Sequence, residues 1–521
     1  MPSPGGLAPP HRLRFRCHIA AALALSVITP AVSAADDRGW DYQPYQIHAV
    51  LAIDVPGGLS QHLADELPKH LQRRAQAAIS PLWSLNVELA TGTMRYRVFS
   101  EIAMSGDEPP AEFPAERDKL LLLAVRWRPN GFELTAREFD RYVERWGVPI
   151  RTICRQEQAL PEQLFAIAWQ AVAPLAQLEI DPDDEQRVRL MPRGAALVRK
   201  DSTTPSLKPG DVFLPIFRRT MRGGEVVEGG IQVVPWTYIE VAESEGGEGV
   251  GSHFLPPAGP IAAGAIKNET RPRWAHEEET IVARIHSANR RPFGVRRQGY
   301  VEQLAIGLRA EPAETVLQLH SRTSPDKPLV GYQVFSQNTV AGVSDPASND
   351  AVTLLGSTDR SGKLAIPPGD TRIRTLYLKN GGQLLARLPI VPGADAQIDV
   401  PLPDDDPRLA AESRLAALRE ELIDVVARRN ILMARTRQKI EQSDFLAAQK
   451  LLAEADQLPG RSQFNLTLTT TARTLRSEDP QIQRRIDQLV EATQTVMNQY
   501  LDLRPINQLH DELRAAQGKG T

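Results

Sequence analysis

Cysteine is nearly absent from this chain, with Cys17 and Cys154 the only two among 521 residues. So few thiols exclude a disulfide framework and a cysteine-rich metal site. Long apolar runs are absent too, since no stretch approaches the roughly eighteen residues that a membrane-spanning helix needs. Neither sign of charge dominates, because 61 Lys and Arg stand against 64 Asp and Glu. This balance argues against nucleic acid as a partner.

Catalytic motifs are also missing. The chain has no H-E-x-x-H zinc motif, no G-x-S-x-G nucleophile elbow and no P-loop. His62, Glu66 and His70 share a helical spacing, but Pro68 interrupts them and no fourth ligand is evident, so we interpret them as an exposed polar face. We therefore predict no catalytic residue, no metal and no cofactor, and the question whether the chain is an enzyme stays open.

The first 34 residues are typical of a secretory signal peptide. Three arginines precede an apolar run from Ile19 to Ile28, and Val32-Ser33-Ala34 offers a cleavage site of small residues. We predict cleavage near Ala34 and export to the periplasm or the exterior of a bacterial cell, with no membrane span remaining. An uncleaved anchor is the alternative. Cleavage of the signal peptide would remove three of the 61 basic residues and no acidic residue. The mature chain would then have 58 basic and 64 acidic residues, a net charge of −6.

Residues 40–180 alternate between strand and helix signals, which is typical of an α/β domain. Residues 46–55 are apolar enough for a buried strand. Apolar positions between Leu63 and Ile79 recur at helical spacing, which predicts a helix. Residues 94–104 fit either a helix or a strand.

The second half of this domain is more distinctive. A continuous apolar run at 119–127 predicts a strand buried on both faces. The turn residues Pro129-Asn130-Gly131 join it to an alternating strand at 132–139, as in a hairpin. We expect an amphipathic helix over 161–178 to close the domain, and an acidic linker at 181–185 to follow.

Residues 188–320 predict a β-rich domain. The clearest strands lie at 207–219, 229–241 and 279–287, and a stretch at 243–264 rich in Gly, Glu and Pro predicts a mobile loop. The Gly-Asp turn at 210–211, which leads into an apolar strand, resembles SH3-like barrels.

Two aromatic residues in this domain are candidates for ligand binding. Trp236 and Tyr238 alternate within one expected strand and would then share a face. Such a pair either packs in the core or forms a platform on which a carbohydrate stacks.

Residues 328–403 contain short apolar runs separated by turn residues, the pattern of antiparallel strands. In the turn Thr358-Asp359-Arg360-Ser361-Gly362, Asp359 is expected to accept a hydrogen bond from the backbone two residues on, and Gly362 to take a positive φ. This turn, with Gly331 before it and a Tyr-containing strand after it, resembles the carboxypeptidase regulatory-like, or transthyretin-like, β-sandwich family. The resemblance implies an accessory domain of an exported protein, with Thr358, Asp359 and Gly362 as its signature.

Beyond residue 403 the apolar period changes from that of strands to that of helices. We predict an α-helical bundle or hairpin over 404–521, with helices ended by Pro459-Gly460 and begun by Asp479-Pro480. Residues 443–459 resemble part of a tetratricopeptide hairpin, but no repeat follows at that motif's spacing.

The sequence therefore predicts a multidomain α+β protein: an N-terminal α/β domain, a β-rich middle that is barrel-like and then a β-sandwich, and a C-terminal helical bundle or hairpin. Our functional hypothesis is an exported, non-enzymatic envelope protein that binds another envelope protein, or itself, through the C-terminal helices. The alternative is an exported hydrolase or carbohydrate-binding protein with the sandwich as its accessory domain.

Overall fold

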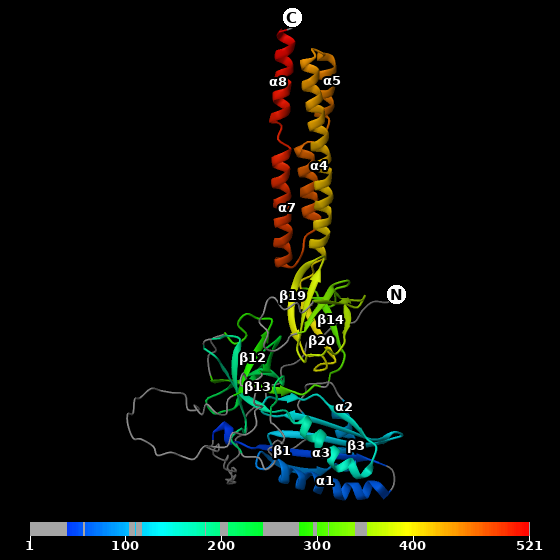
Figure 1. Cartoon of the computed structure of the whole chain (residues 1–521), viewed down its shortest axis with the longest axis vertical. Helices are drawn as coiled ribbons and strands as arrows, with labels where there is room; N and C mark the ends of the chain where they lie inside the picture. The colour runs from blue at the N-terminus through cyan, green and yellow to red at the C-terminus, as the bar shows by residue number, and fades with distance from the viewer. Residues whose placement is uncertain are drawn as a thin grey trace, which may run out of the picture. The chain divides into compact units, whose positions relative to one another are not determined.

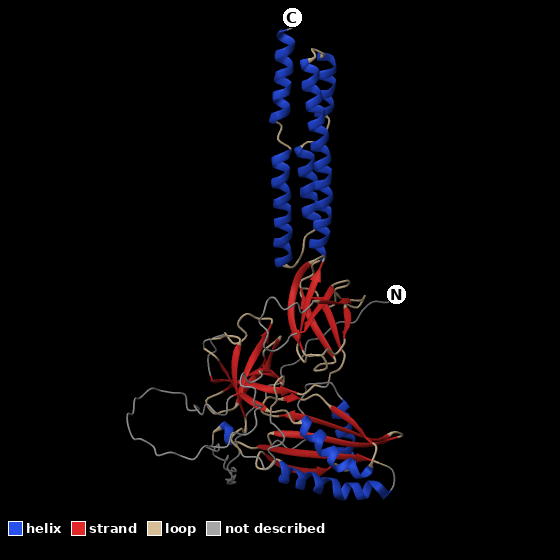
Figure 2. Ribbon diagram, viewed as in Figure 1, coloured by secondary structure: helices blue, strands red, loops and turns tan. Residues whose placement is uncertain are grey.

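The computed structural model describes residues 39–55, 58–103, 110, 117–182, 184–197, 207–242, 281–294, 300–310, 312–338 and 352–519. The predicted signal peptide and the predicted mobile loop at 243–264 lie outside these residues. Within them the chain is a multidomain α+β protein, in which β sheets precede a set of C-terminal helices (Figure 1, Figure 2). This is the fold class that the sequence predicts.

The first sheet is mixed and carries helices on both faces. Its strand order is β2-β1-β3-β4-β5, with β6 paired to β4; β1 runs parallel to β2 and β3, and β4 is antiparallel to β3. The elements are β1 (Tyr45–Asp54), α1 (Gly58–Ala78), β2 (Trp83–Leu89), α2 (Gly92–Ala103), β3 (Lys119–Arg128), β4 (Gly131–Asp140), β5 (Arg145–Trp146), β6 (Ile150–Cys154) and α3 (Leu160–Ala171), with short 3-10 helices at Trp40–Tyr42 and Glu157–Ala159.

Strand β3 shows why this sheet is covered on both sides. Its side chains alternate between two cores, as the period of a strand requires. Leu121 and Leu123 pack in the core that includes residues of α1 and α3, whereas Leu120 and Leu122 pack in the core that includes residues of α2. The prediction of a strand buried on both faces is confirmed for residues 119–125, whereas Trp127 near the end of the predicted run is 45% exposed.

The expected helix over 161–178 is too long. Helix α3 ends at Ala171, and β7 (Leu175–Ile180) begins directly after Pro174. Proline has no N–H to donate and disfavours helical geometry in the residue before it. Strand β7 then pairs with β8 (Arg187–Pro192) in a hairpin, so the linker predicted at 181–185 falls between two strands of one sheet and does not separate two domains.

The second sheet has seven strands in the order β10-β9-β11-β12-β8-β7-β13, and β13 also pairs with β9. That extra pairing makes the sheet barrel-like. Its inner core includes Phe213 and Ile239. The remaining strands are β9 (Val212–Thr220), β10 (Val226–Val233), β11 (Thr237–Val241), β12 (Ile281–Ser287) and β13 (Tyr300–Leu308).

Two further sheets follow, and they share one core. One has the order β17-β14-β20 and the other β16-β15-β18-β19. Residues 315–320, which we expected at the end of the preceding domain, belong here, because β14 pairs with β17 and β20. The strands are β14 (Thr315–Ser321), β15 (Gln333–Asn338), β16 (Thr353–Ser357), β17 (Lys363–Ile366), β18 (Arg374–Asn380), β19 (Gln383–Ile390) and β20 (Gln397–Leu402).

The C-terminal helices form an elongated bundle with three rows of helices (Figure 1). The long helix α4 extends along the whole bundle. Helices α5 and α6 follow one another along one side of α4, and helices α7 and α8 follow one another along another side. No helix in the described part of the chain is both long and apolar enough to cross a membrane. The helices are α4 (Asp406–Glu441), α5 (Phe445–Asp456), α6 (Arg461–Thr474), α7 (Pro480–Tyr500) and α8 (Arg504–Lys519).

Candidate functional site

The two aromatic residues proposed as a platform do not come together. Trp236 lies before β11 and has a φ of 53°, which breaks the alternation that a shared face requires. Tyr238 is buried in the core that includes β1 and β3, whereas Trp236 packs against the core of the last two sheets. The expectation of a shared face is wrong, because sequence spacing does not reveal a left-handed residue.

The turn at 358–362 has the geometry that its residues predict. Asp359 Oδ1 accepts hydrogen bonds from the N–H groups of Ser361 and Lys363, each at 2.8 Å, and Gly362 has a φ of 72°. Thr358 Oγ1 donates to the carbonyl of Leu329 at 2.6 Å. These contacts organise the chain locally.

The histidines of α1 show no metal-site geometry. His70 Nε2 lies 3.1 Å from Oε1 of Glu162 on α3, an exposed contact between the two helices. In the described ranges, no three His, Cys, Asp or Glu side chains are grouped as metal ligands.

A buried charge cluster lies at one end of β3 and β4. Lys119 Nζ donates to Asp140 Oδ2 at 2.7 Å, to Glu138 Oε2 at 3.1 Å and to the carbonyl of Ala173 at 2.8 Å. The three side chains are at most 2% exposed. Register brings them together, because Lys119 pairs with Asp140 across the hairpin and Glu138 is two residues away on the same face.

This cluster ties the first sheet to the start of the second. Glu138 Oε1 accepts a hydrogen bond from the N–H of Ala173 at 2.8 Å. Tyr45 on β1 accepts one from the N–H of Leu175 at 2.9 Å. Ala173 lies between α3 and β7, and Leu175 is the first residue of β7, so these contacts fix the point at which the chain passes from one sheet to the next.

Burial sets the ionisation of this cluster. Burial raises the pKa of Glu138 to about 7, although Lys119 opposes the rise. Burial acts to lower the pKa of Lys119, but Asp140 and Glu138 outweigh it, so the net shift is upward and the ammonium stays charged. Three acceptors surround the three ammonium protons in a site closed to solvent. The arrangement is suited to structural support, and no sequence motif marks it.

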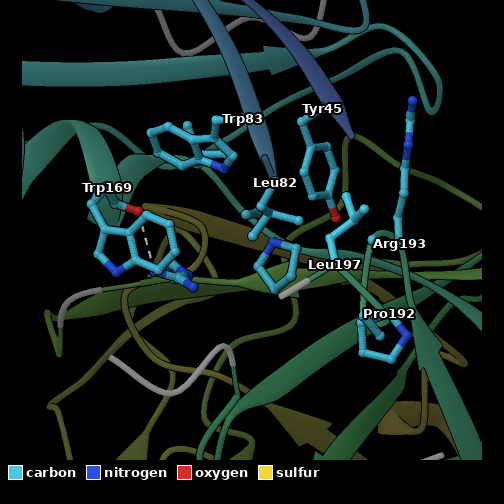
Figure 3. A pocket seen from close by; sticks show the side chains of 13 residues that line it. Tyr45, Leu82, Trp83, Trp169, Pro192, Arg193 and Leu197 are labelled. Carbon is cyan, nitrogen blue, oxygen red and sulfur yellow. Dashed lines mark hydrogen bonds between the residues drawn. The ribbon is translucent and has the colours of Figure 1, made fainter. Parts of the chain in front are cut away.

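A small recess (Figure 3) has a volume of about 60 Å³. Ala173, whose carbonyl accepts a hydrogen bond from Lys119, is one of the residues that line it. Trp83 and Trp169 line it, with their ring centroids 5.0 Å apart. Arg309 Nη1 donates to the carbonyl of Trp169 at 3.3 Å, and in the described ranges no carboxylate forms an ion pair with Arg309. Burial lowers the pKa of this guanidinium. Two indole rings and a guanidinium are thus among the groups that line this recess.

Helix α4 is apolar on two opposite faces. One face packs in the bundle through Leu415, Leu418, Leu422, Val425 and Leu432. The other, which we name the outer face of α4, is exposed. It consists of Ala416, Ile423, Ala427, Ile431 and Ala434. At 100° per residue the two sets lie on opposite sides of the helix.

The outer face is more apolar than a solvated helix surface requires. Ile423 is 60% exposed and Ile431 54% exposed. A single exposed apolar residue needs no explanation, but an aligned set that covers about 27 Å of helix is typical of a contact surface. The helical period of the apolar residues predicted these helices, but it did not separate two stripes on α4. The spacing of the outer residues was a readable signal, since the residues of both sets are three, four or seven positions apart.

Comparison with known proteins identifies no family. No family model and no curated protein matches the chain. Among solved structures, the TolB protein of Acinetobacter baumannii aligns at 10% identity over 70% of this chain and 96% of its own, with a TM-score of 0.16. A similarity at that score does not indicate a common fold.

Proposed function

We propose that this chain is an exported, non-enzymatic protein of the bacterial cell envelope, periplasmic or secreted, that acts by binding another protein through its C-terminal helical bundle. The observation that carries the proposal is the exposed outer face of α4. An amphipathic helix normally buries its apolar stripe once, in its own core. Helix α4 does so and then presents a second stripe to solvent, which fits a surface that a partner covers.

The attachment of α4 supports a mechanical role for the sandwich. The buried hydroxyl of Tyr332 accepts a hydrogen bond from the N–H of Asp405, directly before α4. Arg408 binds both carboxylate oxygens of Asp405 and the carbonyl of Asn380. Buried, satisfied networks of this kind are rigid. In this proposal the sandwich is an accessory domain of the carboxypeptidase regulatory-like type that supports the bundle and performs no chemistry.

An affinity capture tests the proposal. The mature chain from Ala35 is the bait in detergent-solubilised envelope of the source cell, as wild type and as the double variant Ile423→Glu, Ile431→Glu. Both isoleucines are exposed, so the bundle is expected to stay folded. Leu466→Glu, on the exposed side of α6, is the matched control.

We expect a stoichiometric partner with the wild type and with the control, and its loss with the double variant. Burying two carboxylates without partners in a contact surface is strongly unfavourable. Equal capture by all three baits would refute the outer face as the binding surface.

A hydrolase or carbohydrate-binding role is the second candidate, and the recess at Trp83, Trp169 and Arg309 is the observation that favours it. Its volume of about 60 Å³ is small beside the roughly 300–1,000 Å³ of ordinary ligand sites. We therefore rank this function second. Titration of tryptophan fluorescence with monosaccharides and small carboxylates tests it, with Trp169→Phe as the variant that should weaken any response.

A further inference from the structure

We infer that the helical bundle contains a hinge at the level of Arg429, and that opening of the hinge brings the guanidinium of this residue into contact with water. We name this level of the bundle the waist. It comprises residues 426–430 of α4 together with the linkers 457–460 and 501–503. The inference does not depend on the proposed function, and either can fail without the other.

Two of the three rows of helices are interrupted at the waist. Arg429 Nη2 donates a hydrogen bond to the carbonyl of Pro459 at 3.2 Å, which places the linker between α5 and α6 beside Arg429. The other row changes from α7 to α8 at residues 501–503, at the same height along α4 in Figure 1. Within the described bundle, α4 is therefore the only helix that passes the waist without a break.

The apolar core of the bundle is divided at the same level. Val425 packs in one core with Leu501, whereas Leu432 packs in a second core with Ile506. Arg429 occupies the position between Val425 and Leu432 on the inner stripe of α4, four residues after one and three before the other. An arginine thus stands where the helical period calls for an apolar side chain.

The guanidinium of Arg429 is buried without a counter-charge. Arg429 is only 6% exposed, and its Nε and Nη1 atoms form no hydrogen bond within the described structure. Asp456 attracts the guanidinium from a distance, but burial outweighs this attraction and lowers the pKa of Arg429. The carboxylate of Asp456 instead lies 3.0 Å from Nε2 of His510. A buried charge and buried donors without acceptors both destabilise the closed bundle.

Opening at the waist relieves this unfavourable burial. Nε and Nη1 of Arg429 are closed to solvent in the packed bundle, so a water molecule reaches them only when the rows separate. The linkers 457–460 and 501–503 can absorb the change in backbone angles, as hinge segments commonly do. Helix α4 has to bend, which disrupts its own backbone hydrogen bonds near Arg429. The two apolar cores can stay packed while this happens.

Hydrogen exchange of the purified mature chain, followed by mass spectrometry, tests the inference. An amide inside a helix exchanges only when the helix opens locally. After correction for intrinsic rates, we expect the amides at 426–432 to exchange at least about tenfold faster than those at 415–422. Both segments lie in the interior of α4, so fraying of the helix ends does not explain such a difference.

Two variants show whether the buried charge causes the opening. Arg429→Met has a similar volume but no charge, and it should slow exchange at 426–432 at least about tenfold, because the closed bundle no longer buries an uncompensated guanidinium. Arg428→Met is the matched control. Its guanidinium is 64% exposed and pairs with Glu454, so its loss should not slow exchange at 426–432.

Three results would overturn the inference. Equal exchange at 426–432 and 415–422 in the wild type refutes the hinge, whatever the variants show. Exchange at 426–432 that Arg429→Met leaves unchanged, or makes faster, refutes the buried charge as its cause. An equal slowing by Arg428→Met and Arg429→Met refutes it as well, because burial distinguishes the two arginines.

Discussion

Replacing Lys119 by Met gives the sharpest test of how the buried charge cluster supports the fold. The side chain of Lys119 is 1% exposed and balances Glu138 and Asp140, which are equally buried. Methionine fills a similar volume but donates no hydrogen bond. Removing one partner of a buried ion pair costs about 3–5 kcal/mol, because the remaining charge is left uncompensated.

The loss of stability in Lys119→Met should depend on pH. The pKa of Glu138 is raised to about 7 in the folded protein from an ordinary value of 4.5. A raised carboxyl pKa lowers the stability as pH increases through that window, by about 3 kcal/mol for a shift of this size. Without the ammonium the folded-state pKa rises further. The difference between Lys119→Met and wild type should therefore grow as pH rises above 7 and change little between pH 7 and pH 5.

Urea unfolding followed by tryptophan fluorescence measures this effect. Five of the seven tryptophans lie between residues 40 and 171, so the signal follows the first sheet and its helices. Lys69→Met is the control, because that side chain is 63% exposed and its loss should change stability by less than about 0.5 kcal/mol. Equal stability of the two variants at pH 8, or a loss that grows as pH falls, would refute the reasoning.

Two further predictions concern the sandwich and its contact with the bundle. Gly362→Ala should lower the unfolding temperature much more than Gly331→Ala: both positions have positive φ, but only at 362 would the new Cβ lie 2.3 Å from the carbonyl of Leu319. Similar shifts for the two variants would contradict this. Asp479→Ala should cost about 1–3 kcal/mol in urea unfolding, because Asp479 is the N-cap of α7 and also accepts a hydrogen bond from Arg322 at 2.8 Å. An unchanged midpoint would show that this cap is dispensable.

Local patterns in the sequence identified much of the fold. The apolar run at 119–127 specified a strand covered on both faces, because only a central strand buries every side chain. The turn at 129–131 and the cap at Asp479 marked the ends of elements, since each uses a residue suited to that position.

The errors arose where local and long-range information conflict. Residues 175–178 look like the end of an apolar helix, but Pro174 separates them from α3. They pair with the adjacent strand β8 in a hairpin and with β13, which lies far along the chain. Strand β14 belongs to the sheet in which it pairs with β20, some eighty residues later in the chain. Pairing partners at such separations leave no local trace in the sequence.

The candidate sites also differ in whether local sequence patterns could reveal them. Lys119, Glu138, Asp140 and Ala173 meet only after a hairpin and a crossover have formed, so no spacing reveals their cluster. The outer face of α4 is different, because its residues are neighbours on one helix and their spacing could be read directly. What the spacing alone does not show is which stripe is buried.

Photo-crosslinking in the source cell decides whether the outer face of α4 is a binding surface. A photoreactive amino acid replaces Ile431 on the outer face or, as the control, Gln488 on the exposed side of α7. We predict a discrete covalent adduct from position 431 and none from position 488. No adduct at 431, or the same adducts from both positions, would contradict the account.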